Sequence, residues 1–300
     1  MARAFPSAPE ETATHDRCRA AARQAVGVLG DVWVAPHLDR GAGHMLRRDS
    51  GDSTEFHDHR LYVPGDDPRR INWAAYARSG QLSLKLFRQE GRPLIDCLVD
   101  VSPSMWNPDD KGERTLELLY FVIESAAAQQ AGLRLWALSG TGIIPLPNEL
   151  FASGGSWVEQ LPEAADDALP ISTSNVPLRS GSRRVLISDL LFPVEPDDLI
   201  RPLTARNGNV SILAPWHPQE ADPEWRGVCQ LDDSETRTMR EVEFDPASLK
   251  AYHVAYSRHF ENWQRACRSH GCSLSRIPCL EPLAAALGAE LSTLNPSVTT

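Results

Sequence analysis

Oxygen-bearing side chains follow two apolar segments of this 300-residue chain at the point where each segment ends. Asp100, Ser102 and Ser104 come directly after the apolar run that begins at Leu94, and Asp189 ends the later run RVLISD. Carboxylates and hydroxyls are hard oxygen ligands, and Mg²⁺ is usually held by one or two carboxylates while it keeps several waters. These residues therefore indicate a divalent cation site. The alternative is two strands followed by ordinary turns.

The segments around these residues alternate between strand and helix patterns. The runs 93–99, 133–138, 184–189 and 210–214 are typical of buried strands, and apolar residues recur at helical spacing over 113–131. Such alternation predicts a mostly parallel sheet covered on both faces, that is, a three-layer Rossmann-like α/β sandwich. Carboxyl ends of parallel strands face the same edge of a sheet, so we expect Asp100 and Asp189 to lie near each other.

The sequence predicts further elements before, between and after these strands. Helical patterns cover 14–29 and 153–168, and a long helix is expected from Pro246 to about residue 270. Residues 228–244 alternate and carry many charges, which predicts an exposed hairpin or a strand insertion. None of these segments carries a recognisable catalytic motif.

Residues 40–90 differ from the rest because they are rich in Arg, Asp, His and Gly. Alternation at 55–63 and 82–87 predicts short strands, and PGDDP at 64–68 is a strong turn signal. The segment has too little apolar content for a core of its own. We therefore expect it to dock on the α/β domain and to bury Trp73.

Composition narrows the classes of function. The net charge is −10 and the pI is about 5.4, so the chain as a whole has no electrostatic footprint for nucleic acid. The six cysteines form no C-x-x-C pair, which favours reduced thiols. No apolar run approaches the roughly 18 residues that span a bilayer, and the first residues have no signal-peptide pattern. We expect a soluble, cytoplasmic protein.

Two motifs resemble known families. DVSPSM at 100–105 between a strand and a helix, with a later strand ending in SDL, resembles the metal-ion-dependent adhesion site (MIDAS) of von Willebrand factor type A domains. FHDHRLYVPGDDPRRINWAAYARSGQLSLKLFRQE at 56–90 is similar to the signature of the bacterial DUF58 family, which joins such a motif to a type-A-like domain. We therefore expect a disordered tail at 1–13, a helix with a β-rich motif segment at 14–90, and a type-A-like domain at 91–295.

The resemblance to type A domains also implies roles for individual residues. In those domains the two serines bind the ion directly and the aspartates act mainly through water, so Asp100, Ser102, Ser104 and Asp189 are the expected ligands of Mg²⁺ or another divalent cation. A Thr between the third and fourth strands completes the family's site, and Thr173 is the candidate here. The other hydroxyl residues in that interval are Ser153, Ser156, Ser172 and Ser174.

The family resemblance implies a non-enzymatic protein-interaction module whose ion accepts a carboxylate from a partner. DUF58 proteins resemble components of systems built around MoxR-type AAA+ ATPases that assemble or mature other proteins. The expected partners are therefore that ATPase and a client protein. Two alternatives stay open, a metal-free structural subunit and a metal-dependent nuclease or phosphatase. The second alternative is less favoured, because such sites usually gather three or four carboxylates and only two acids end strands here.

Overall fold

A computed structural model gives the structure of the protein. It describes residues 8–29, 54–62, 71–89, 92–147, 151, 170–232 and 238–294. The chain divides into two compact units. One unit joins Met1–Pro36 to Pro93–Thr300, and the other is His37–Arg92. The expected helix at 153–168 and the PGDDP turn lie outside the described residues.

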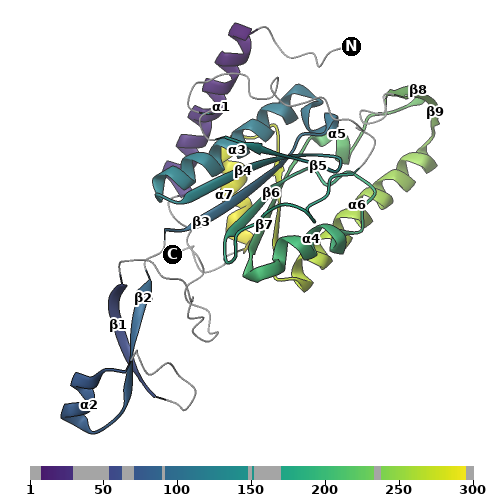
Figure 1. Ribbon diagram of the computed structural model, residues 1–300. Coiled ribbons are helices and arrows are strands. Elements are labelled where there is room, and N and C mark those ends of the chain that lie inside the picture. The colour runs from purple at the N-terminus through teal and green to yellow at the C-terminus, as the bar shows by residue number, and fades with distance from the viewer. Residues whose placement is uncertain are drawn as a thin grey trace. The chain divides into compact units, whose positions relative to one another are not determined.

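A six-stranded sheet forms the centre of the larger unit, with the strand order β10-β7-β6-β3-β4-β5 (Figure 1). Only the pair β4–β5 is antiparallel, and the other neighbours are parallel. The strands are β3 (Leu94–Asp100), β4 (Gly132–Ser139), β5 (Gly142–Leu146), β6 (Arg183–Ile187), β7 (Asn209–Trp216) and β10 (Ser273–Pro278). The predicted Rossmann-like α/β class is confirmed, and so are the expected adjacent parallel strands β3 and β6.

Helices cover both faces of this sheet, and each face has its own apolar core. On one face, Cys97 and Val99 of β3 pack with residues of three helices. These are α1 (Ala8–Leu29), α3 (Asp109–Ala128) and α7 (Leu283–Leu294). On the other face, Leu98 packs with residues of α4 (Pro196–Thr204) and α6 (Pro246–Ser269). Successive residues of β3 thus serve opposite cores, which is why its sequence is apolar throughout.

The helix α1 begins earlier than expected and belongs to the α/β unit. We expected a disordered tail at 1–13 and a helix at 14–29 grouped with the motif segment, but α1 is helical from Ala8 and packs against α3 and α7. The small side chains of Ala22 and Ala25 are fully buried in that contact. The His15 imidazole lies 2.7 Å from the Tyr120 hydroxyl of α3. The boundary expected at residue 91 therefore does not separate the two units, because α1 lies on the α/β side of it.

The smaller unit contains a hairpin and one short helix. Strands β1 (Thr54–Leu61) and β2 (Ser83–Gln89) pair antiparallel, close to the positions predicted from alternation. The helix α2 (Trp73–Ser79) lies between them in the chain, and its N-cap side chain, Asn72, accepts a hydrogen bond from Ala75 N at 3.1 Å. Trp73 is 60% exposed and packs edge-on against Tyr76 of the same helix, and its expected burial against the α/β domain stays a prediction.

In chain order, the remaining described elements come after β3 and before the long helix α6. They are the short helices η3 (Pro103–Trp106), η5 (Ala205–Asn207) and α5 (Pro218–Ala221), and the strands β8 (Gly227–Asp232) and β9 (Met239–Phe244). The pairing of β8 with β9 confirms the predicted hairpin. Across the part of the chain that the structure describes, no helix has the length and apolar character to cross a membrane.

Candidate functional site

The candidate site lies at the carboxyl edge of the sheet, between β3 and β6. Val99 and Ile187 are paired in register; Asp100 is the last residue of β3, and Asp189 lies two residues after the end of the neighbouring strand β6. The strand order runs outward from this pair in both directions, to β4 and β5 on one side and to β7 and β10 on the other. This is the topological switch point, where open α/β sheets form their binding crevices.

One half of the site consists of Asp100, Ser102, Ser104 and Ser188, which we call the serine cluster. Asp100 is fully buried, and its carboxyl group accepts hydrogen bonds from Ser102 N at 2.9 Å and from Ser188 Oγ at 2.7 Å. The hydroxyls of Ser102 and Ser104 lie 3.2 Å apart and are partly exposed. The predicted Asp-Ser-Ser group is therefore brought together at the edge of the sheet.

Ser188 is a member that sequence reasoning missed. Strand alternation from Asp189 would point this side chain away from the site. The pairing of β6 with its neighbours ends at Ile187, however, so the next residues are free of that alternation. The backbone then turns through Leu190, which has a left-handed φ of 61°. Such a conformation costs a non-glycine residue about 1–3 kcal/mol and is concentrated at functional sites.

The environment of Asp100 changes its protonation. Burial raises the pKa of this carboxyl group to about 7, and the negative charge of Asp189 adds to the effect. The hydrogen bonds from Ser102 and Ser188 act in the opposite direction without cancelling it. The protonated form of Asp100 is therefore favoured more than in an exposed aspartate.

The other half of the site consists of Lys111, Asp189 and Glu220, which we call the lysine cluster. Lys111 Nζ lies 2.6 Å from Asp189 Oδ2 and 2.5 Å from Glu220 Oε1. The side chains of Lys111 and Asp189 are each 1% exposed, and that of Glu220 is 18% exposed. Burial lowers the pKa of Lys111, but the two carboxylates outweigh burial and hold the pKa above its ordinary value. The ammonium group is therefore charged.

Sequence reasoning found only Asp189 of this cluster. The helix was predicted from residue 113, but α3 begins at Asp109, so Lys111 lies in its first turn. The adjacent pair Asp109 and Asp110 is the signal that was available, since acidic residues are favoured at a helix N-terminus. Glu220 comes from the four-residue helix α5, far away in the sequence, and no periodicity marks it.

His217 and Tyr252 hold Glu220 in its position. Its Oε2 accepts a hydrogen bond from His217 N at 3.0 Å, which completes a capping box at the start of α5. The Tyr252 hydroxyl of α6 donates to the Glu220 carbonyl oxygen at 2.5 Å. His217 thus holds the carboxylate that meets Lys111, and Tyr252 holds the backbone of the same residue.

Thr173 has a different partner from the one expected. Its hydroxyl is buried and donates to the Leu199 carbonyl oxygen of α4 at 2.8 Å. Ser172 Oγ accepts a hydrogen bond from Ser174 N at 3.4 Å, within the same loop. These contacts connect the loop to itself and to α4. Ser153 and Ser156 lie outside the described residues.

The donor set does not fit a resident divalent ion. Mg²⁺ is usually held by one or two carboxylates that are free to coordinate it, but Asp189 and Glu220 already share the Lys111 ammonium as their cation. Among the described residues, no three side chains of the His, Cys, Asp or Glu types are grouped to hold a metal ion. The magnesium site implied by the resemblance stays a prediction, and the pairing of Asp189 with Lys111 argues against it.

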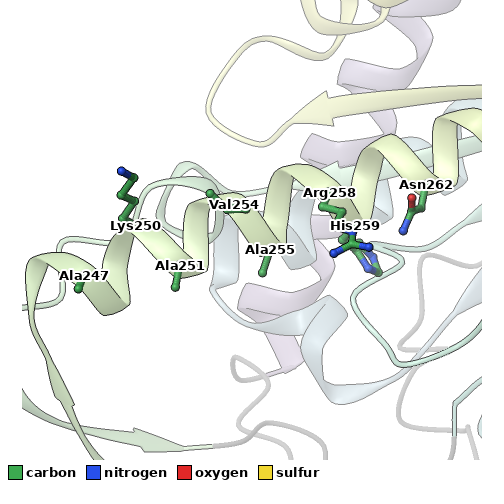
Figure 2. A pocket seen from close by; sticks show the side chains of 8 residues that line it. All are labelled: Ala247, Lys250, Ala251, Val254, Ala255, Arg258, His259 and Asn262. Carbon is green, nitrogen blue, oxygen red and sulfur yellow. The ribbon is translucent and has the colours of Figure 1, made fainter.

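A shallow hollow of about 630 Å³ lies along α6. Its lining residues, including Lys250, Val254 and Arg258, all come from this one helix, and Figure 2 shows them along one side of it. A hollow lined by a single helix is an exposed helix face and not an enclosed ligand pocket. His259, on the same face, connects it to the site through Nε2, which lies 2.7 Å from the Leu190 carbonyl oxygen.

Fold and site together define an α/β domain with a polar cluster at its switch point. The family model described as "Protein of unknown function DUF58" matches residues 58–262, so this chain belongs to the DUF58 family. The uncharacterized proteins Mb1516 of Mycobacterium bovis and Rv1480 of Mycobacterium tuberculosis are each 27% identical to it over 240 residues. Those matches cover 75% of this chain and 74% of each relative.

Two solved structures are also similar to this chain. The conserved hypothetical protein BatB from Bacteroides thetaiotaomicron has a TM-score of 0.38 at 12% identity, and the match covers 68% of this chain and all of BatB. An aerotolerance-related membrane protein from Bacteroides fragilis has a TM-score of 0.36 at 11% identity, with 67% and 99% covered. Scores of this size carry no inference about function.

Proposed function

We propose that this protein is a non-enzymatic protein-interaction module that contacts its partner with the carboxyl edge of the sheet. One observation carries the proposal. At the switch point the hydroxyls of Ser102 and Ser104 are partly exposed, while the carboxyl groups of Asp100, Asp189 and Glu220 already have partners inside the protein. Such an edge offers hydrogen bonds to another protein but no carboxylate poised to activate water.

The proposed partner is a MoxR-type AAA+ ATPase, which would act with this protein on a client during assembly or maturation. Membership of the DUF58 family supports this partner, because the family resembles components of MoxR systems. An ATPase partner also implies a compartment that contains ATP, and we therefore propose a cytoplasmic location. The likeness of the edge to the adhesion site of type A domains supports binding by the same surface.

Replacing both exposed hydroxyls tests the proposal. The double variant Ser102→Ala/Ser104→Ala removes two hydrogen-bonding groups from the edge and should weaken binding to the purified ATPase about tenfold, since each bond contributes about 0.5–1.5 kcal/mol. Biolayer interferometry with the full chain measures this. Ser180→Ala is the matched control, because Ser180 is exposed before the amino end of β6. Equal affinity of the double variant and the wild type would contradict the proposal.

A hydrolase is the second candidate, and one observation favours it. A carboxyl group with a pKa of about 7 beside the Ser102 hydroxyl has the protonation behaviour of a general base. The carboxyl group of Asp100 is, however, fully buried and already hydrogen-bonded at both oxygens. Hydrolysis of p-nitrophenyl phosphate or acetate that is lost in Asp100→Asn would favour the hydrolase over the interaction module.

A further inference from the structure

We propose that the Lys111 ammonium is the resident cation of this edge and takes the two roles that a divalent ion has at an adhesion site. It neutralises an acid at the end of a strand, Asp189, and it captures a second carboxylate, Glu220, from the same chain. The edge is therefore built to hold its shape without a metal. The inference is independent of the proposed partner, because its test measures only metal binding and folding.

The position of Lys111 supports this inference. A cation in the first turn of a helix is disfavoured by the helix dipole, whose positive end lies there. Burying an ammonium group costs several kcal/mol more unless it is paired. Lys111 is nevertheless 1% exposed in the first turn of α3. Its two carboxylate contacts, at 2.6 and 2.5 Å, are what offset both costs.

The contacts of Glu220 support the comparison of Lys111 with a divalent ion. Asp189 Oδ2 and Glu220 Oε1 both lie within hydrogen-bond distance of a single nitrogen atom, as two carboxylates lie around one ion. Asp189 Oδ1 accepts from Leu191 N at 3.0 Å, and Glu220 Oε2 accepts from His217 N. Each carboxylate therefore uses one oxygen for its own backbone and one for the lysine. Lys111 thereby connects α3, the end of β6 and α5.

Manganese binding by the wild-type protein is the first test. The full chain is titrated with MnCl₂, and free Mn²⁺ is followed by electron paramagnetic resonance; melting temperatures are compared in EDTA and in millimolar MnCl₂. We expect no stoichiometric ion and a melting temperature that is unchanged within about 1 °C. The proposal is overturned by one tightly bound Mn²⁺ per chain that is lost in Asp189→Asn.

Removal of the lysine is the second test. Lys111→Ala leaves the buried carboxylate of Asp189 facing the partly buried carboxylate of Glu220 and should lower the melting temperature in EDTA by roughly 5–15 °C. MnCl₂ should restore part of this loss, and Lys111→Ala/Asp189→Asn should lose the restoration. Lys250→Ala, at an exposed position of α6, is the control and should melt like the wild type.

Two results with these proteins would contradict the proposal. Lys111→Ala with an unchanged melting temperature in EDTA would overturn the proposal, because the ammonium would then hold nothing. If Lys111→Ala does not fold, the MnCl₂ titration of the wild-type protein tests the proposal without it. A folded wild type without bound Mn²⁺ supports Lys111 as the cation, and a bound ion at Asp189 contradicts it.

Discussion

Two aspartates end neighbouring strands at this edge, and their surroundings give them different tasks. Asp189 is paired with Lys111 at 2.6 Å, whereas the partners of Asp100 in the described contacts are hydroxyl and amide groups. Burial therefore raises the pKa of Asp100 to about 7. The Asp189 carboxyl group belongs to a buried cluster with Lys111, and the Asp100 carboxyl group is a hydrogen-bonding centre with a raised pKa.

The raised pKa of Asp100 predicts how stability changes with pH. A carboxyl group whose folded pKa lies above its unfolded value contributes stability at low pH, and this is lost as pH rises through about 7. Relative to Asp100→Asn, the wild type should therefore lose roughly 2–4 kcal/mol of unfolding free energy between pH 4 and pH 8. Urea denaturation measures the unfolding free energy of both proteins at each pH. Titrating groups that the two proteins share cancel in the difference between them. Parallel curves would contradict this account.

The sequence predicted those parts of the site that are local. Asp100, Ser102 and Ser104 are close in the chain, and Asp189 could be added because parallel strands end at one edge. Asp109 and Asp110 marked the start of α3 and so the place of Lys111 in its first turn, but no local pattern indicated that Glu220 of α5 would meet Lys111. Thr173 was chosen from the family pattern alone, and its hydroxyl binds Leu199 O.

At the scale of elements, α1 shows that helical periodicity predicts a helix but not the surface against which it packs. The helical pattern was visible from residue 14, but nothing local indicates which surface a helix covers. Its buried residues Cys18, Ala22 and Ala25 are small, so α1 approaches α3 and α7 closely. The strands of the sheet were easier to predict, because each is a short apolar run between turns.

The close approach of α1 predicts a strong effect of side-chain size. Ala22→Leu adds three carbon atoms to a fully buried position and should cost about 1–3 kcal/mol of unfolding free energy by overpacking. Gln24→Leu, at an exposed position of the same helix, is the control and should change stability by less than about 0.5 kcal/mol. Urea titration measures both, and equal effects would show that α1 is not part of the core.

At the scale of the whole molecule, the two apolar clusters of the described residues lie in one of the two units. Every residue of both apolar clusters belongs to the unit formed by Met1–Pro36 and Pro93–Thr300. This includes the helix α1, which a division near residue 91 separates from the sheet. The unit His37–Arg92 has Trp73 largely exposed on its short helix.

This division predicts different results for two deletions. Removal of residues 1–90 takes α1 away, exposes its contact surface on α3 and α7, and should give an aggregating protein. Replacing residues 37–92 with a flexible Gly-Ser linker keeps α1 and should give a monomer that unfolds cooperatively. Size-exclusion chromatography and thermal unfolding compare the two. Aggregation of the second deletion alone would contradict the division.

Site-specific photo-crosslinking tests most directly whether the carboxyl edge is the binding surface. p-Benzoylphenylalanine is placed at Leu191, which is 37% exposed beside Asp189, or at Ser180 near the amino end of β6. Each protein is then irradiated with the purified MoxR-type ATPase. We expect a cross-linked product from position 191 and none from position 180. Cross-linking from position 180 alone, or from both positions equally, would contradict the account.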